Sequence, residues 1–122
     1  MKYRHYAPSA DYTIYKGDEV KVAEKIIELA NEKADEGKIT GIKTADQHLH
    51  MYQGRLNKSI KVVSLGDLEK PEIVANHLFK ALRDFDKVDT EFIFGEAFSE
   101  KNVGQAIMNR LTKAAGYNII DV

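Results

Sequence analysis

Hydrophobic and polar positions follow two different periods along this chain. Short apolar or β-branched runs closed by a glycine, such as residues 12–15 before Gly17, are typical of β-strands. Longer segments in which apolar residues recur every three or four positions predict helices, most clearly over 18–36. The two patterns predict strands at 12–15, 39–42, 60–65, 91–94 and 117–122, and helices at 18–36, 44–52, 71–85 and 102–116.

Signals for helix ends support several of these boundaries. Asp18 can cap the start of the first helix, and Gly37 can supply the left-handed residue at its end. Two further pairs have the form of a capping box that opens a helix, Thr44 with Gln47 and Asn102 with Gln105.

Strands that alternate with helix-length connections predict a parallel sheet, because hairpin neighbours need short loops. We therefore expect an α/β fold, a Rossmann-like three-layer sandwich of about five mostly parallel strands with helices on both faces. The expected strand order is 3-2-1-4-5. At 122 residues the chain has the length of one domain.

Composition narrows the function classes. Eighteen basic and nineteen acidic residues give a net charge of -1, so the molecule as a whole has no electrostatic preference for DNA or an anionic membrane. The absence of cysteine excludes disulfides, thiol catalysis and thiolate metal sites. No apolar run approaches the roughly 20 residues that span a bilayer, and the first residues of the sequence do not have the pattern of a signal peptide. We expect a cytoplasmic protein.

The loops after the predicted strands contain little that would bind a nucleotide. After the first strand there is one glycine, Gly17, followed by Asp18 and Glu19. A dinucleotide site needs several glycines so that the backbone can approach the pyrophosphate, and two acids would repel it. The sequence therefore argues against an independent nucleotide-binding enzyme.

His48 and His50, with Asp46 nearby, are the candidates for a metal site. Two residues apart on a helix, the histidines point to nearly opposite sides, and zinc needs three or four converging ligands. We expect solvated surface histidines and no metal. An independent hydrolase would need a pocket in which one of these rings meets an acid, and the spacing predicts none.

The chain opens with basic and aromatic residues before any apolar period begins. Cations neutralise phosphate, while tyrosine and histidine rings stack on bases, so this mixture favours contact with a nucleotide. The residues concerned are Lys2, Tyr3, Arg4, His5 and Tyr6. A second unusual feature is the last helix, where Asn109 and Arg110 interrupt apolar and small residues.

Residues 2–8, KYRHYAP, resemble the interdomain linker motif of the two-domain form of threonylcarbamoyl-AMP synthase. The helix around Asn109 and Arg110 resembles the end of that enzyme's C-terminal domain, and residues 64–67 and 75–83 also fit the family. The resemblance covers nearly the whole chain.

The resemblance implies a role in making threonylcarbamoyl-adenylate from threonine, bicarbonate and ATP for the t6A modification of tRNA. In the family an N-terminal domain carries the chemistry and the nucleotide site. This chain would then be a fragment or a detached domain, with residues 1–10 as linker and active-site lid and 11–122 as one accessory domain. We expect no catalytic residues, no cofactor bound by the domain alone and no activity in isolation, with ATP and Mg²⁺ bound in the full-length enzyme. The catalytic domain would be its partner, with other tRNA modification proteins as further candidates.

Two roles follow for the candidate residues. The opening segment from Lys2 to Tyr6 would close over the nucleotide site of the catalytic domain and exclude water. Asn109 and Arg110 would dock the linker or contact a ligand, unless they simply meet water. The alternative for the chain is a stand-alone α/β interaction module, or one that binds a small ligand or RNA without catalysis.

Overall fold

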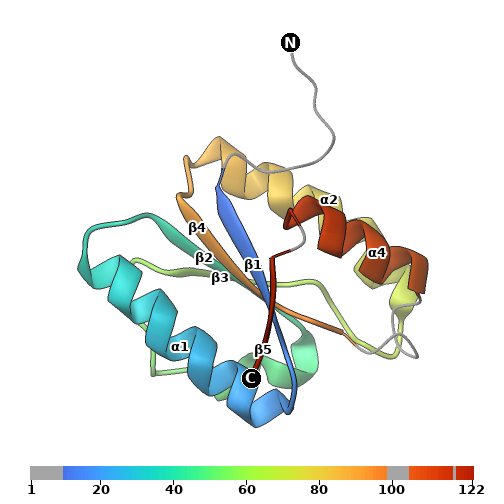
Figure 1. Ribbon diagram of the computed structural model, residues 1–122, viewed down its shortest axis with the longest axis horizontal. Helices are drawn as coiled ribbons and strands as arrows, with labels where there is room; N and C mark the ends of the chain where they lie inside the picture. The colour runs from blue at the N-terminus through green and yellow to red at the C-terminus, as the bar shows by residue number, and fades with distance from the viewer. Residues whose placement is uncertain (1–9, 99–104, 117) are drawn as a thin grey trace.

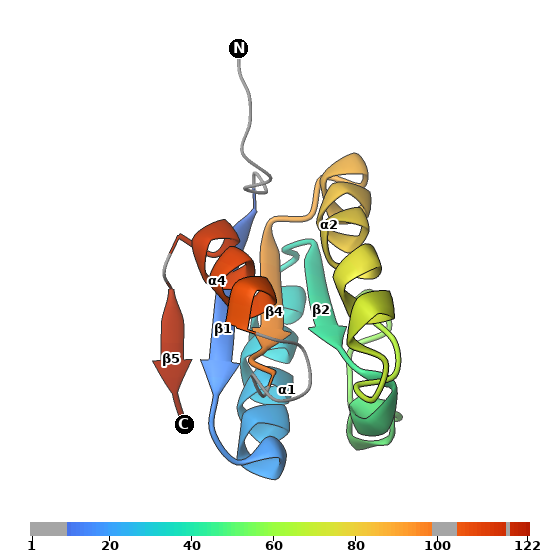
Figure 2. The same ribbon diagram turned by 90° about the vertical axis from the view of Figure 1, so that its right-hand side faces the viewer.

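The structure is a computed structural model that describes residues 10–98, 105–116 and 118–122. Its elements are β1 (Asp11–Lys16), α1 (Glu19–Asp35), β2 (Thr40–Thr44), the 3-10 helix η1 (Asp46–Met51), β3 (Lys61–Ser64), α2 (Pro71–Lys87), β4 (Phe92–Glu96), α4 (Gln105–Ala114) and β5 (Ile119–Asp121). The five strands form one sheet, in which every pair of neighbours is parallel. Helix α1 covers one face, and α2 and α4 cover the other (Figures 1 and 2). The predicted three-layer α/β architecture is confirmed.

Helix α1 forms as its sequence predicts. The Asp18 carboxylate accepts hydrogen bonds from the backbone N–H groups of Val20 and Lys21, both at 3.1 Å, and so caps the first turn. Gly37 follows the helix with a φ of 85°, the left-handed region that glycine enters without strain. The buried stripe against the sheet comprises Val22, Ala23, Ile26, Ile27, Ala30 and Ala34.

The capping box predicted at Thr44 and Gln47 is wrong. Thr44 is the last residue of β2, and its hydroxyl donates to the carboxylate of Glu96 instead of capping a helix. The segment that follows is the short 3-10 helix η1, preceded by Ala45 without a side-chain cap. A hydrogen bond from the Thr44 hydroxyl to a buried carboxylate is stronger than the bond between neutral groups that would cap a helix. The tertiary contact therefore overrides the local signal. The other predicted cap, Asn102, lies outside the described residues.

The strand order is β3-β2-β4-β1-β5, so the predicted order 3-2-1-4-5 is wrong at its centre. Strand β4 lies between β2 and β1, with Phe94 in register with Ile42 on one side and Thr13 on the other. Central strands are covered on both faces. Residues 93–96 of β4 are all buried, whereas residues 119–121 of β5 are all exposed at the edge. The carboxyl ends of β2, β4 and β1 therefore meet at one edge of the sheet.

A glycine on β2 sets how closely α2 approaches the sheet. The ring of Phe85, which is fully buried, lies directly over Gly41, and a Cβ added to this glycine would come within 2.4 Å of the Phe85 Cε1 atom. Gly95 on β4 leaves room in the same way for the ring of Tyr12, at 2.9 Å from an added Cβ. Both contacts need a residue without a side chain.

We predict that Gly41→Ala destabilises the domain by about 2 kcal/mol, because the fully packed Phe85 ring must move to accept the new methyl group. Shrinking the ring with Phe85→Leu relieves this overlap, so the double variant should lose less stability than the sum of the two single variants. Urea unfolding measures all three. Strictly additive losses would contradict direct contact between the two residues.

Candidate functional site

A buried carboxylate lies at the carboxyl end of the sheet, where α/β proteins usually bind their ligands. Glu96 ends β4 and is 4% exposed. Its Oε2 atom accepts hydrogen bonds from the Thr44 hydroxyl at 2.7 Å and from the Tyr52 hydroxyl at 2.5 Å. Its Oε1 atom lies 2.6 Å from Nδ1 of His48. One carboxylate thus joins β4 to β2 and to the η1 segment.

His48 extends this cluster to α1. Its second ring nitrogen, Nε2, lies 3.1 Å from Oε2 of Glu19 in the first turn of α1. The hydrogen bond to Glu96 is the main cause that raises the pKa of His48 above its usual 6.5; burial opposes this, and Glu19 adds to it. Burial, together with the charge of Glu96, also raises the pKa of the Tyr52 phenol. These groups form a charged, hydrogen-bonded cluster that we call the Glu96 cluster: Glu19, Thr44, His48, Tyr52 and Glu96.

The prediction that His48 is a solvated surface residue is therefore wrong, since its side chain is only 14% exposed. His50 is exposed, as predicted. The spacing between His48 and His50 relates the two histidines only to each other. The carboxylates that hold His48 lie 29 and 48 residues away in sequence, so local spacing could not find them.

In the Glu96 cluster, a histidine does contact an acid, as a hydrolase would need, but the arrangement is not suited to catalysis. A general base needs a ring nitrogen available to the substrate, and both nitrogens of His48 face carboxylates. The Thr44 hydroxyl donates to Glu96 and so is not activated by the histidine. In the ranges that the structure describes, no group of three or more potential ligands could hold a metal ion. The cluster is a structural contact.

A second buried polar pair lies on the opposite face of the sheet. The amine of Lys43, which is 1% exposed, donates to the hydroxyl of Tyr12 at 2.6 Å and lies 4.3 Å from the centre of its ring. Burial lowers the pKa of Lys43 to about 7 and raises that of Tyr12. Tyr12 packs into the core with Val74 and Phe85 of α2. This pair therefore belongs to the core beneath α2.

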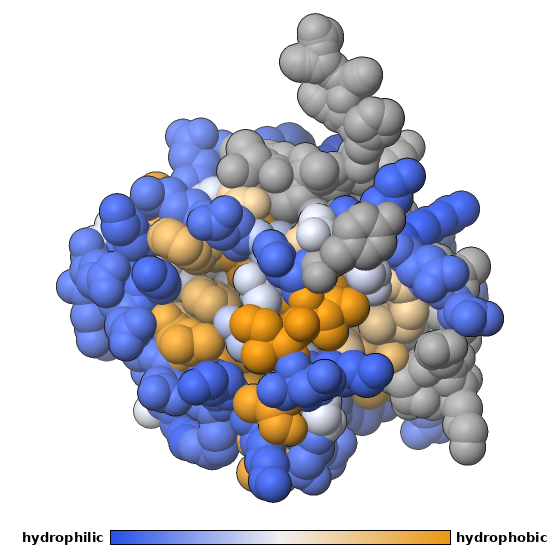
Figure 3. Space-filling view, in the orientation of Figure 1, coloured by the Kyte–Doolittle hydropathy of each residue, from blue (hydrophilic) through white to orange (hydrophobic). Residues whose placement is uncertain are grey.

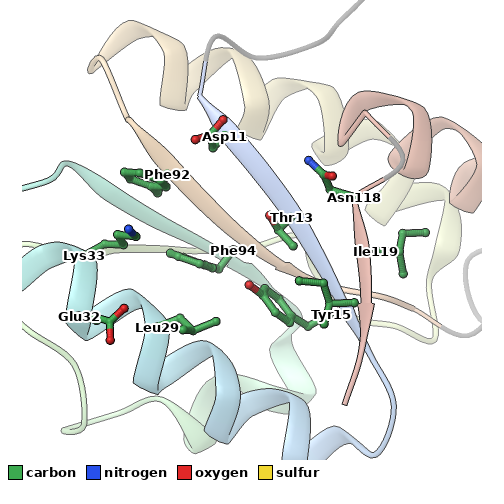
Figure 4. Close-up of a pocket in the computed structure, with 11 residues that line it drawn as sticks. Asp11, Thr13, Tyr15, Leu29, Glu32, Lys33, Phe92, Phe94, Asn118 and Ile119 are labelled. Atoms are coloured by element: carbon green, nitrogen blue, oxygen red, sulfur yellow. The ribbon is translucent and has the colours of Figure 1, made fainter.

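An open groove of about 650 Å³ lies on the α1 face, and none of its described lining residues belongs to the Glu96 cluster. Tyr15 and Phe94 are buried against each other at its floor, with ring centres 6.1 Å apart. The amine of Lys33 lies 4.7 Å from the centre of the Phe92 ring at one side. Figure 4 shows how side chains from α1, β1, β4 and β5 surround the groove. Its lining comprises Asp11, Thr13, Tyr15, Leu29, Glu32, Lys33, Phe92, Phe94, Asn118, Ile119 and Ile120.

The candidate residues from the sequence lie elsewhere. Lys2, Tyr3, Arg4, His5 and Tyr6 fall outside the described residues. Asn109 and Arg110 are both exposed on α4, which covers the face opposite to the groove (Figure 2). The structure does not bring them together with the Glu96 cluster.

Sequence reasoning missed the buried polar residues Lys43, Tyr52 and Glu96. One signal was present for Glu96, because it follows Phe92 and Phe94 at the strand period and so points to the same face as these apolar residues. No helix in the described ranges is long and apolar enough to cross a membrane.

We predict that His48→Gln lowers stability by about 1–2 kcal/mol at pH 6, because glutamine can donate to Glu96 but carries no charge. The folded pKa of His48 is raised, so its contribution is complete below the unfolded value of 6.5 and is lost as pH rises through the folded value. The difference between wild type and variant in urea unfolding should therefore shrink as pH rises. His50→Gln is the matched control and should leave stability unchanged. A difference independent of pH would contradict the charged contact.

We also predict that Lys43→Met and Tyr12→Phe each cost about 1–3 kcal/mol, since each leaves the other polar group buried without its partner. The double variant replaces the pair by apolar groups of similar shape and should return to within about 1 kcal/mol of wild type. Unfolding free energies of the four proteins provide the measurement. Additive losses would show that the two groups do not depend on each other.

Comparisons with known proteins agree on one family. Residues 1–116 match the family model for the C-terminal domain of threonylcarbamoyl-AMP synthase. The threonylcarbamoyl-AMP synthase of Pyrococcus abyssi is 42% identical over 122 residues, which are 100% of this chain and 33% of the relative. The Bacillus subtilis enzyme is 39% identical over 98% of this chain and 32% of its own length.

Solved structures give the same result. Pyrococcus abyssi Sua5 crystallised with L-threonine is 41% identical and superposes with a TM-score of 0.76, covering 100% of this chain and 33% of that one. The C-terminal Sua5 domain from Pyrococcus horikoshii is 34% identical, with a TM-score of 0.69, and the match covers 95% of this chain and 100% of that domain. The chain spans about a third of the length of its full-length relatives. It belongs to the family of C-terminal domains of threonylcarbamoyl-AMP synthase.

Proposed function

We propose that this chain serves as the accessory domain of an enzyme that makes threonylcarbamoyl-adenylate from threonine, bicarbonate and ATP. The family match over residues 1–116, against relatives three times as long, carries this proposal, because it leaves two thirds of each relative for another domain. Threonine as a substrate is supported by the Pyrococcus abyssi protein crystallised with L-threonine. ATP and Mg²⁺ would bind to the catalytic domain.

The geometry of the first turn of α1 supports a nucleotide site outside this domain. A helix that binds phosphate offers unpaired N–H groups at its N-terminus. Here the Asp18 carboxylate already accepts from two of these groups, and the Val22 N–H donates to the Asp18 carbonyl. Glu19 adds a second carboxylate at the same place. The turn after β1 is therefore negatively charged and occupied, which disfavours a pyrophosphate.

In the described part of the chain, the side chains at the carboxyl end of the sheet bind one another. The Glu96 cluster links β2, β4, η1 and α1, and its hydrogen-bonding groups are directed at one another. A second negative charge placed there would face Glu96 and Glu19. An ATP molecule thus has more suitable surroundings in a basic site on another domain.

Residues 1–10 are proposed as the linker to that domain, with 11–122 as the accessory domain. Lys2 and Arg4 can neutralise phosphate charge, and Tyr3 and Tyr6 can cover the site and exclude water from a labile carbamate. The segment would thereby act as a lid. Asn109 and Arg110 are exposed on α4 and so are accessible to the linker, to a ligand or to another tRNA modification protein.

We predict that Tyr3→Ala combined with Arg4→Ala in the full-length enzyme lowers threonylcarbamoyl-adenylate formation about tenfold or more, since a displaced lid admits water and releases the phosphates. Single-turnover formation of the adenylate is the measurement. Arg83→Ala, which removes an exposed cation from α2, is the control and should keep the wild-type rate. Unchanged kinetics in the double variant would rule out the lid.

A further inference from the structure

The α1 face of the sheet is covered along only part of its width. Helix α1 packs mainly over β2 and β4 and contacts β1 to a smaller extent, whereas the side of β5 is open, as Figure 1 shows. Apolar side chains gather on this face at the middle of the molecule (Figure 3), and Ile119 and Ile120 are 37% and 46% exposed. The groove lies over this uncovered part. Its open lining, which combines apolar and polar side chains, favours an interaction surface.

The charges of the lining favour a basic occupant. Asp11 and Glu32 contribute two carboxylates, and the ion pairs found among the described residues include neither of them. Lys33 is the basic residue among the described lining residues, and it already contacts the Phe92 ring and lies 3.9 Å from Glu36. The aromatic floor formed by Tyr15 and Phe94 suits a flat or aromatic side chain.

The opening segment has the complementary composition. It carries Lys2 and Arg4 against the two carboxylates of the groove, and the rings of Tyr3 and Tyr6 against its aromatic floor. A second copy of the domain would instead present the same carboxylates and so place like charges together. Charge complementarity therefore selects the chain's own segment over a symmetric dimer.

The segment is also attached at the right place and is long enough. It joins β1 at Asp11, which itself lines the groove. From Asp11 to Tyr15 the groove follows four residue steps of β1, roughly 13 Å at about 3.3 Å per residue. The nine residues before Ala10 can span up to about 30 Å. The five residues from Lys2 to Tyr6 also correspond to about four residue steps, the length of the groove along β1.

We infer that the groove between α1 and β5 is a docking site for residues 2–6, where the segment lies when it is not closed over the catalytic domain. This inference rests on the proposed lid function and adds a second resting place for the lid. Occupation of the groove by the segment would compete with closure, because the same tyrosines and cations would be needed at both places.

The absence of cysteine allows a direct test, since His5→Cys introduces one unique site for a nitroxide spin label in the full 122-residue chain. Paramagnetic broadening of backbone amide signals should then be strongest around the groove, at Thr13, Leu29 and Phe92, which should lose most of their intensity. Amides of Asn109 and Arg110 on α4 should keep theirs, because they lie across the sheet.

Charge reversal provides the matched comparison. Glu32→Lys, alone or with Asp11→Lys, should restore the intensity of the groove amides by repelling the segment. Glu28→Lys, an exposed position on the same helix outside the groove, should leave the broadening unchanged. Glu32→Lys alone changes one exposed residue on the helix surface, so it still tests the inference if the double variant does not fold.

Broadening that is uniform, or strongest on α4, would overturn the inference. A second experiment mixes spin-labelled chains that carry no ¹⁵N with ¹⁵N-labelled chains that carry no spin label. Broadening in this mixture would also overturn the inference, because it would place a second copy on the groove. Either result leaves the lid itself standing if Tyr3→Ala with Arg4→Ala still slows adenylate formation in the full-length enzyme. The two proposals therefore fail separately.

Discussion

The buried carboxylate of Glu96 is the contact on which the arrangement of this domain depends most. It receives hydrogen bonds from Thr44, Tyr52 and His48, and through His48 it is linked to Glu19. A carboxylate that is 4% exposed would be strongly destabilising without such partners. The same contacts fix three elements around the end of β4: strand β2, the η1 segment and the first turn of α1. The charge of Glu96 is therefore stabilised only when these elements are in place, and the elements are in turn held by the contacts to Glu96.

This use of the sheet edge has a consequence for function. In open α/β sheets the carboxyl ends of the strands usually form the ligand site. Here the described side chains at that edge bind one another, and the Asp18 carboxylate accepts from two N–H groups that could have held a phosphate. Among the described residues, an open groove lies on the α1 face, with two carboxylates and an aromatic floor. The charges and rings of this groove favour a basic peptide segment over a nucleotide, which is consistent with the accessory role that we propose.

The sequence predicted most elements because their signals are local: the stripe of α1, the Asp18 cap and Gly37 each act within a few residues. It failed where contacts between distant residues decide. Thr44 has the sequence of a cap, but its hydroxyl bonds to a residue 52 positions away, and His48 looks solvated until the acids from β4 and α1 are placed beside it. Strand order failed for the same reason, because hydrophobic runs show which strands are buried but do not specify their neighbours.

We propose that this domain does not bind the nucleotide by itself and that the catalytic domain does. Calorimetric titration of ATP with Mg²⁺ onto the 122-residue chain, and onto the same chain joined to its catalytic domain, tests this most directly. Binding heat that saturates only for the joined protein is the predicted result. Saturable binding of ATP to the isolated domain, at an affinity similar to that of the joined protein, would contradict it.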